Sequence, residues 1–308
     1  MALMVFSIVI GGCSRLVPAD GPPASDHLPQ RSEIHAVPFY PQEDHQCGPA
    51  ALAMVLEWSG LRMPPGILRE QVFTPAVKGS YQSAIIGAAR RQGRIAYPVS
   101  NRKDLLDEVA AGHPAIVLQN LGFSWYPVWH YAVVIGYDLR QDVIFLHSGT
   151  FPRKQLTMSV FNATWGRSRN WGLLVLPPDR LPVTAELPLF ISAVIGLEQA
   201  GRWAAAIEGY DTALKHWPSS LAARIGLGNC WYALGNLTAA EKILRETSRR
   251  FPEEGGVFNN LAQVLFEQHK QQEALETARR AVQLGGPLVE VYRKTLEEIQ
   301  AGYCAQGR

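Results

Sequence analysis

The sequence lacks the features that mark several common classes of protein. Its 29 basic and 27 acidic residues nearly cancel, and no basic run with interleaved aromatic residues occurs. A formal charge of +2 gives no electrostatic basis for binding nucleic acid. Glycine-rich phosphate loops and the close cysteine and histidine spacings of zinc sites are also missing. We therefore expect no cofactor, no metal and no nucleic-acid partner.

Cysteine is scarce, and its four occurrences do not form a disulfide framework. Cys13, Cys47, Cys230 and Cys304 are far apart and lie in unlike contexts, so each needs its own explanation. Cys230 stands beside Trp231 in a predicted helix and is expected to pack in a core. Cys304 receives no predicted role.

Long apolar runs are absent as well. The run from Ala2 to Ile10 is far shorter than the roughly 20 residues of a membrane-spanning helix. It suits the core of a signal peptide, although no Lys or Arg precedes this run. The following Gly11-Gly12-Cys13-Ser14 resembles a bacterial lipobox, which implies cleavage before Cys13 and lipidation of that residue.

These features predict how the chain begins and where it resides. We expect a lipoprotein signal peptide over 1–12 and a tether, rich in Pro, Ser, Asp and Gly, over 13–33. Ser14 rather than Asp implies sorting to the outer membrane. The expected location is the periplasmic face of the outer membrane of a bacterial cell envelope, with membrane contact only through the lipid anchor.

Residues 34–180 carry the alternating signals of an α+β domain. Pro49 near the start and Gly60 after the end bracket the first predicted helix. Helices come first and an antiparallel sheet follows, which favours the α+β class. Helices are expected over 48–58, 80–92 and 103–111, and strands over 114–119, 131–137, 143–147 and 171–176.

Past Pro188 the sequence acquires a 34-residue period, which is the tetratricopeptide signature. Such repeats form an all-α solenoid whose groove binds peptides or partner helices. Alternatively, the repeats serve only as a scaffold that spaces or stabilises the neighbouring domain. The period is carried by Gly201 and Gly235, by Pro218 and Pro252, and by Ala206, Ala240 and Ala274. Over 186–300 we expect three repeats, 186–219, 220–253 and 254–287, and a capping helix at 288–300.

Cys47 lies at the first turn of an apolar, alanine-rich helix, five residues after Gln42. A thiol at a helix start meets exposed N–H groups and the positive end of the helix dipole. Both favour the thiolate, so we expect a lowered thiol pKa at this position. A thiolate is the nucleophile of a cysteine hydrolase.

A cysteine nucleophile needs a base, and His130 is the best candidate among eight histidines. It opens the predicted strand that ends at Tyr137 and follows the aromatic loop 123–129. A histidine at a strand start is held by the sheet and can still face a cleft. The aromatic loop is expected to form a wall of that cleft and to exclude water.

Residues 34–178 resemble the bacteriocin-processing, double-glycine-cleaving family of papain-fold cysteine peptidases. The resemblance rests on Gln42, on the Cys47–Ala51 helix start and on the His130–Val134 strand with Gly136 and Tyr137 after it. It implies that Cys47 attacks a peptide carbonyl, that His130 serves as base and then acid, and that Gln42 donates to the oxyanion. The whole chain is similar to free-standing lipoprotein members with C-terminal tetratricopeptide repeats.

The family places an Asp or Asn at the end of the strand after the hairpin, where it orients the histidine. Residues 145–149 contain no acid there. We take His147 as the candidate third member. The ring could instead be held by a group from the same or a neighbouring segment, or by none at all; those candidates are Ser148, Asp138, Asp142 and Asn120.

The predicted function is an envelope-anchored cysteine peptidase whose repeats recruit a protein substrate or partner. Its expected catalytic residues are Cys47, His130, Gln42 and His147. One alternative is a catalytically inactive papain-like and repeat scaffold that binds envelope proteins. Another is a cysteine amidase or acyltransferase that acts on a non-peptide substrate.

Overall fold

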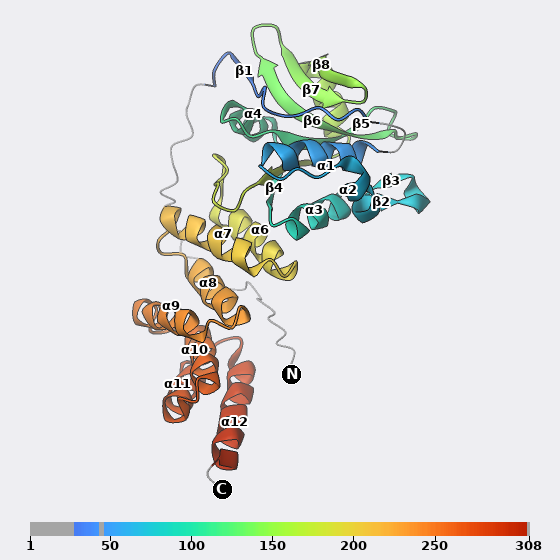
Figure 1. The fold of residues 1–308 in the computed structure, drawn as a ribbon. Helices are drawn as coiled ribbons and strands as arrows, with labels where there is room; N and C mark the ends of the chain where they lie inside the picture. Colours follow the sequence, from blue (N-terminus) through green and yellow to red (C-terminus); the bar gives the residue numbers. More distant parts are fainter. Residues whose placement is uncertain (1–27, 43–45, 307–308) are drawn as a thin grey trace.

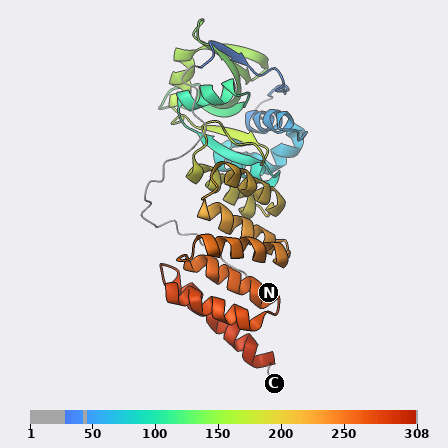
Figure 2. The same ribbon diagram turned by 90° about the vertical axis from the view of Figure 1, so that its left-hand side faces the viewer.

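A computed structural model describes residues 28–42 and 46–306. Figure 1 shows a domain with a β-sheet at one end and a stack of helices that leads away from it, and Figure 2 shows the same arrangement from the side. The predicted signal peptide, the lipidation site Cys13 and most of the tether lie outside the described residues. No helix in the described part is both long and apolar enough to span a membrane.

Most strands of the described chain join one antiparallel sheet, in the order β4-β9-β5-β6-β7-β8, with β1 added beside β6. A separate small hairpin is formed by β2 and β3. The strands are β1 (Arg31–Glu33), β2 (Phe73–Thr74), β3 (Gly79–Ser80), β4 (Ile95–Val99), β5 (Ala115–Asn120), β6 (Trp129–Asp138), β7 (Val143–Ser148), β8 (Phe151–Thr157) and β9 (Gly172–Leu176).

Strand β6 is the centre of this sheet. Its first half pairs with β5 and its last residues pair with β1, while β7 runs along its other edge. Gly136 lies where β1 approaches, and a Cβ there would stand 2.6 Å from the carbonyl oxygen of Ser32. Only glycine therefore lets β1 pair with β6 at this point.

The helices of this domain are α1 (Cys47–Trp58), α2 (Pro65–Val72), α3 (Gln82–Arg91), α4 (Arg102–Ala110) and α5 (Met158–Gly166). Helix α1 packs against β6 and also contacts α2 and α3. Its residues 48–56 are all buried, as expected for a helix that is apolar on every side. The arrangement confirms the predicted α+β class.

The helical stack consists of α6 (Leu187–Gln199), α7 (Trp203–His216), α8 (Leu221–Ala233), α9 (Leu237–Arg250), α10 (Gly255–Glu267), α11 (Gln271–Leu284) and α12 (Val289–Gln306). The predicted 34-residue period is visible in the backbone. The turn inside each helix pair contains a residue with φ between 62° and 75°, namely Gly201, Gly235 and His269. The fully buried Ala206, Ala240 and Ala274 keep the same step. The stack confirms the predicted repeat solenoid.

The first repeat packs directly on the sheet domain. Helix α6 lies against β4, and one apolar core runs from the sheet to α8, where Cys230 is fully buried as predicted. The segment before α6 is also anchored, because the buried Glu108 carboxylate accepts hydrogen bonds from the Thr184 N–H (2.7 Å) and hydroxyl (2.6 Å). The two parts are therefore joined by both packing and buried hydrogen bonds.

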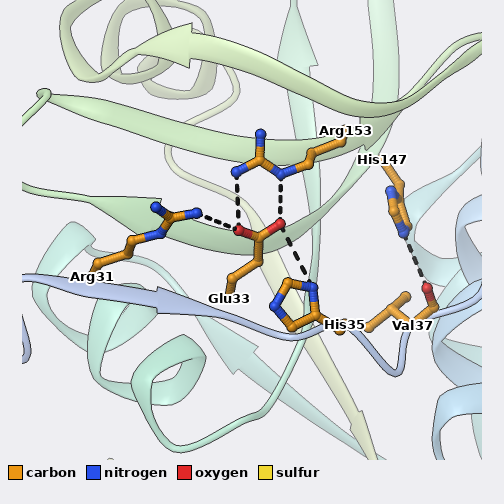
Figure 3. A network of polar contacts seen from close by, with 6 residues as sticks. All are labelled: Arg31, Glu33, His35, Val37, His147 and Arg153. Carbon is orange, nitrogen blue, oxygen red and sulfur yellow. Dashed lines mark hydrogen bonds and ion pairs between the residues drawn. The ribbon is translucent and has the colours of Figure 1, made fainter.

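An ion-pair network fixes the short strand β1 to β8. Glu33 accepts hydrogen bonds from Arg153 (2.5 and 2.9 Å) and from Arg31 (3.2 Å), as Figure 3 shows. These contacts, that with Arg153 foremost, lower the pKa of Glu33 from 4.5 to about 2. A carboxyl whose pKa is depressed by folding stabilises the folded state above its unfolded pKa and loses that contribution as the pH falls through its folded pKa.

We predict that Glu33→Gln lowers the free energy of unfolding at pH 7 by about 1 kcal/mol, a modest value because the Arg153 side chain is partly exposed to water. The difference from wild type should shrink between pH 4.5 and 2, where the carboxyl takes up its proton. Urea unfolding at several pH values measures both. Glu290→Gln, which removes the exposed partner of Arg293, is the matched control and should change little. A Glu33→Gln effect that is equal at pH 7 and pH 2 would contradict the assignment.

Candidate active site

Cys47 is the first residue of α1 and is half buried. No side chain caps this helix start, and Pro49 has no N–H, so the first free backbone donors are those of Cys47 and Gly48. Backbone groups of Tyr131, Gly48 and Cys47 interact with the sulfur and lower its pKa. The sulfur thus lies between the start of α1 and the first residues of β6.

The expected net lowering of the Cys47 pKa is nevertheless wrong. Burial is the largest influence on this thiol, and it raises the pKa above the ordinary value despite the backbone donors. Desolvation penalises the charged thiolate more than the N–H groups at the helix start repay. The free protein therefore holds Cys47 mainly as a thiol at neutral pH.

Gln42 connects the segment before Cys47 to the sheet. Its side-chain Nε2 donates to the carbonyl of Tyr131 (3.2 Å), and its Oε1 accepts from the N–H of Gly149 (2.8 Å). Its backbone N–H also donates to the Gly149 carbonyl (2.9 Å). The amide is thus oriented by β6 on one side and by the β7–β8 turn on the other, and Nε2 retains a second hydrogen.

His130 lies near the start of β6, opposite Gln119 of β5. Its ring Nε2 is 2.9 Å from the hydroxyl oxygen of Ser148, the last residue of β7. Burial lowers the pKa of His130 to about 4, and the charge of Lys154 lowers it further. The ring is therefore neutral at pH 7, and its Nε2 is occupied by Ser148.

One cleft of about 1210 Å³ brings these groups together, because Gln42, Cys47 and His130 all line it. Its other lining residues are mostly apolar or uncharged, with Lys78, Arg167 and Arg169 as the charged exceptions. Within residues 28–42 and 46–306, no group of three or more His, Cys, Asp or Glu is placed to hold a metal ion.

Family models match both parts of the chain. Residues 34–172 match the Peptidase_C39 like family, and residues 197–264 match a tetratricopeptide repeat. The chain contains a C39-like peptidase domain followed by tetratricopeptide repeats. The predicted family resemblance is thereby confirmed. No curated protein matches the sequence.

Several solved peptidase structures are similar to the C39-like domain. A chain described as a C39-like peptidase from Bacillus anthracis is 17% identical, covers 47% of this chain and 97% of its own, and has a TM-score of 0.40. The peptidase domain of Streptococcus ComA is 23% identical, with 46% and 98% covered and a TM-score of 0.38. A double-glycine-motif protease of an AMS/PCAT transporter, solved with its leader peptide, is 21% identical, with 47% and 92% covered and a TM-score of 0.36.

His147 is not the third member of the C39-like site. Its Nε2 faces the carbonyl oxygen of Val37 (3.1 Å), as Figure 3 shows, and its ring packs edge-on against Phe39. In β7 it is the neighbour of Ser148, so the two side chains point to opposite faces of the strand. This alternation puts Ser148 on the His130 face and directs His147 to the other.

Apart from Ser148, the other candidates for that position make different contacts. Asp138 accepts from the backbone of the β6–β7 turn, and the left-handed Asp142 ends the same turn. Asn120 accepts from the N–H groups of Gly122 and Val128, so it shapes the loop between β5 and β6. Ser148 was among the sequence candidates, but nothing in the sequence ranked it above the others.

The aromatic loop forms the expected cleft wall only in part. Only Pro127 and Trp129 of this loop line the cleft, whereas the stacked rings of Phe123 and Trp125 face solvent, with Trp125 81% exposed. Arg167, for which the sequence predicted no role, donates to the carbonyls of Asn120 (3.2 Å) and Gly122 (2.9 Å). The loop is thus held at the rim of the cleft.

We predict that iodoacetamide alkylates Cys47 of the free protein at a rate that rises about tenfold per pH unit from pH 6 to 8. The raised thiol pKa and the neutral His130 leave only a small thiolate fraction, which grows with pH. The rate is measured by quenching the reaction at set times and quantifying the alkylated Cys47 peptide by mass spectrometry. A rate that is constant between pH 5 and 7 would instead reveal a preformed thiolate–imidazolium pair.

We predict that Ser148→Asp raises the rate of Cys47 alkylation at pH 7 about tenfold. A carboxylate on Nε2 raises the pKa of His130, and one pKa unit corresponds to a tenfold change in the population of the charged ring. Ser148→Asn, of nearly the same size but uncharged, is the control and should leave the rate within about twofold of wild type. Equal rates for the Asp and Asn variants would show that the group on Nε2 does not control the thiol.

Proposed function

We propose that the chain is a cysteine peptidase that hydrolyses peptide bonds by a Cys–His mechanism. The observation that carries the proposal is that Cys47, His130 and Gln42 line one cleft of a C39-like domain. Nucleophile, base and oxyanion donor are the three parts that acyl transfer through a thiol requires.

The reaction begins with proton transfer from the Cys47 thiol to Nδ1 of His130. The sulfur then forms a bond to the carbonyl carbon of the substrate, and the carbonyl electron pair moves to oxygen. The resulting imidazolium donates from Nε2–H to the Ser148 hydroxyl oxygen, which keeps the ring in one orientation. The ring next protonates the leaving amine, and the acyl-enzyme forms as the C–N bond breaks.

The oxyanion is received by the free hydrogen of Gln42 Nε2 and by the backbone N–H of Cys47. The hydrogen bonds of Gln42 to Tyr131 and Gly149 fix the amide before substrate arrives. Water then attacks the acyl-enzyme with His130 as base. The carboxylic acid leaves, and the thiol is restored.

A neutral resting pair is compatible with this reaction. The thiolate has to form only at the moment of attack, when the oxyanion donors and the substrate carbonyl share its charge. The absence of a carboxylate on His130 then makes proton transfer the demanding step, and turnover should be slower than in a site with a preformed ion pair.

We further propose that the protein is anchored to the bacterial outer membrane through Cys13 and that its repeats recruit a protein substrate or partner. The apolar run with its lipobox-like sequence supports the anchor, and the repeat match supports protein binding. Because the first repeat packs on the sheet domain, a partner held by the repeats would be presented at a fixed position relative to the cleft.

A second candidate function is a non-catalytic scaffold. The raised pKa of Cys47, the lowered pKa of His130 and the uncharged Ser148 are the observations that favour it. In that case the domain and the repeats would bind envelope proteins without cleaving them.

The test is hydrolysis of denatured, fluorescently labelled casein by the full chain. We predict cleavage that is abolished by Cys47→Ser and reduced by about 10²–10⁴ in His130→Ala, the range that general acid–base catalysis supplies. His216→Ala, which removes an exposed histidine of α7, is the matched control and should retain full activity.

Three results would count against the peptidase. Cleavage that survives Cys47→Ser would place the activity elsewhere. Hydrolysis of p-nitrophenyl acetate without casein cleavage would favour the non-peptide amidase or acyltransferase. A protein that hydrolyses neither substrate would favour the scaffold.

A further inference from the structure

Among the described residues, the charged side chains that line the cleft beside Cys47 are all cationic. Lys78, Arg167 and Arg169 line it, and no Asp or Glu among the described residues does so. The chain as a whole carries nearly as many acidic as basic residues, so the cleft does not simply repeat the overall charge. Clefts lined by charge of one sign attract ligands of the opposite sign.

Two of these cations stand on separate turns at the cleft. Lys78 occupies the turn of the β2–β3 hairpin, and Arg169 occupies the turn between α5 and β9. Both side chains are exposed, and no carboxylate of the described chain pairs with either of them. Within the described residues, their charges therefore stay available to a ligand.

Both residues also adopt a costly backbone conformation. Lys78 has φ of 46° and Arg169 has φ of 59°, in the left-handed region that residues other than glycine seldom enter. Glycine or asparagine would fill such positions with less strain. Backbone strain of this kind clusters at active sites and ligand-binding segments, and both residues lie at the cleft.

Hydrogen bonds fix the backbone at both turns. The Tyr131 hydroxyl, one residue after His130, donates to the carbonyl of Ser80 in the hairpin (3.0 Å). The indole of Trp165 donates to the carbonyl of Trp171, which closes the other turn (2.8 Å). The hairpin turn is thus tied to the strand that carries His130, and the other turn is closed between α5 and β9.

We propose that the cleft selects acidic peptide segments and that Lys78 and Arg169 are the specificity-determining residues. This inference deepens the proposed peptidase function and rests on it for the identity of the substrate as a peptide. Arg167 adds positive charge, but it also holds the aromatic loop through backbone carbonyls, so it is less suited to a test.

The first experiment compares two alkylating probes of similar size at Cys47, anionic iodoacetate and neutral iodoacetamide. We expect the iodoacetate-to-iodoacetamide rate ratio to exceed that of N-acetylcysteine amide by about threefold to tenfold at low salt, as expected for two charges that line the same partly solvated cleft as the sulfur. The excess should fall in 1 M NaCl because salt screens exposed charges.

Lys78→Asn with Arg169→Asn removes both charges with a residue that tolerates the left-handed conformation. We expect this double variant to lose most of the excess ratio, in which any change in the thiolate population of Cys47 cancels because both probes react with the same thiolate. Arg249→Gln with Lys294→Gln removes the same net charge from exposed positions of α9 and α12 and should keep the wild-type ratio. A wild-type ratio equal to that of the free thiol, or one that the double asparagine variant leaves unchanged, would overturn the inference.

A second experiment digests a pool of tryptic peptides from a denatured bacterial proteome. We expect Asp and Glu to be enriched near the cleavage sites of wild type and to lose this enrichment in Lys78→Asn with Arg169→Asn. Cleavage without acidic enrichment would overturn the inference and leave the peptidase standing. A complete absence of cleavage would instead overturn the peptidase function, and the alkylation ratio would still decide whether the cleft favours anions.

Discussion

Gln42 makes the contacts on which the candidate site depends. Its side chain and backbone bond to Tyr131 and Gly149, which adjoin His130 and Ser148 in the sequence. Gln42, which precedes α1 in the chain, thus ties this segment to the strand that carries His130 and to the turn that follows Ser148. These bonds make the amide both a structural tie and a pre-oriented donor, so loss of Gln42 would disturb geometry and charge stabilisation together.

The electrostatic state of the site follows from burial more than from any partner. Burial raises the pKa of Cys47 and lowers that of His130, so both groups are driven toward their neutral forms. Ser148 can hold the ring without stabilising its charge. The cations that line the cleft have a different role, because they attract an incoming anion and do not contact Cys47 or His130.

The sequence predicted the fold better than the electrostatics. Periodicity identified α1, the central strand β6 and the repeat step, because these depend on local patterns of apolar and small residues. The strand β8 was missed, since residues 151–157 are largely exposed and carry charge and proline. The family resemblance placed Cys47, His130 and Gln42 in one site, but whether His147 or Ser148 meets the ring depends on strand register. The thiol pKa depends on desolvation, which appears only once the chain is folded.

The central claim is that Cys47 and His130 face one cleft as a neutral pair until substrate arrives. Nitrogen NMR of the full chain with ¹⁵N-labelled histidine, assigned by comparison with His130→Ala, tests it most directly. We predict that the His130 ring is neutral at pH 7, with its proton on Nε2, and titrates near pH 4. A charged His130 ring at pH 7 that becomes neutral in Cys47→Ala would show a preformed ion pair and contradict this claim.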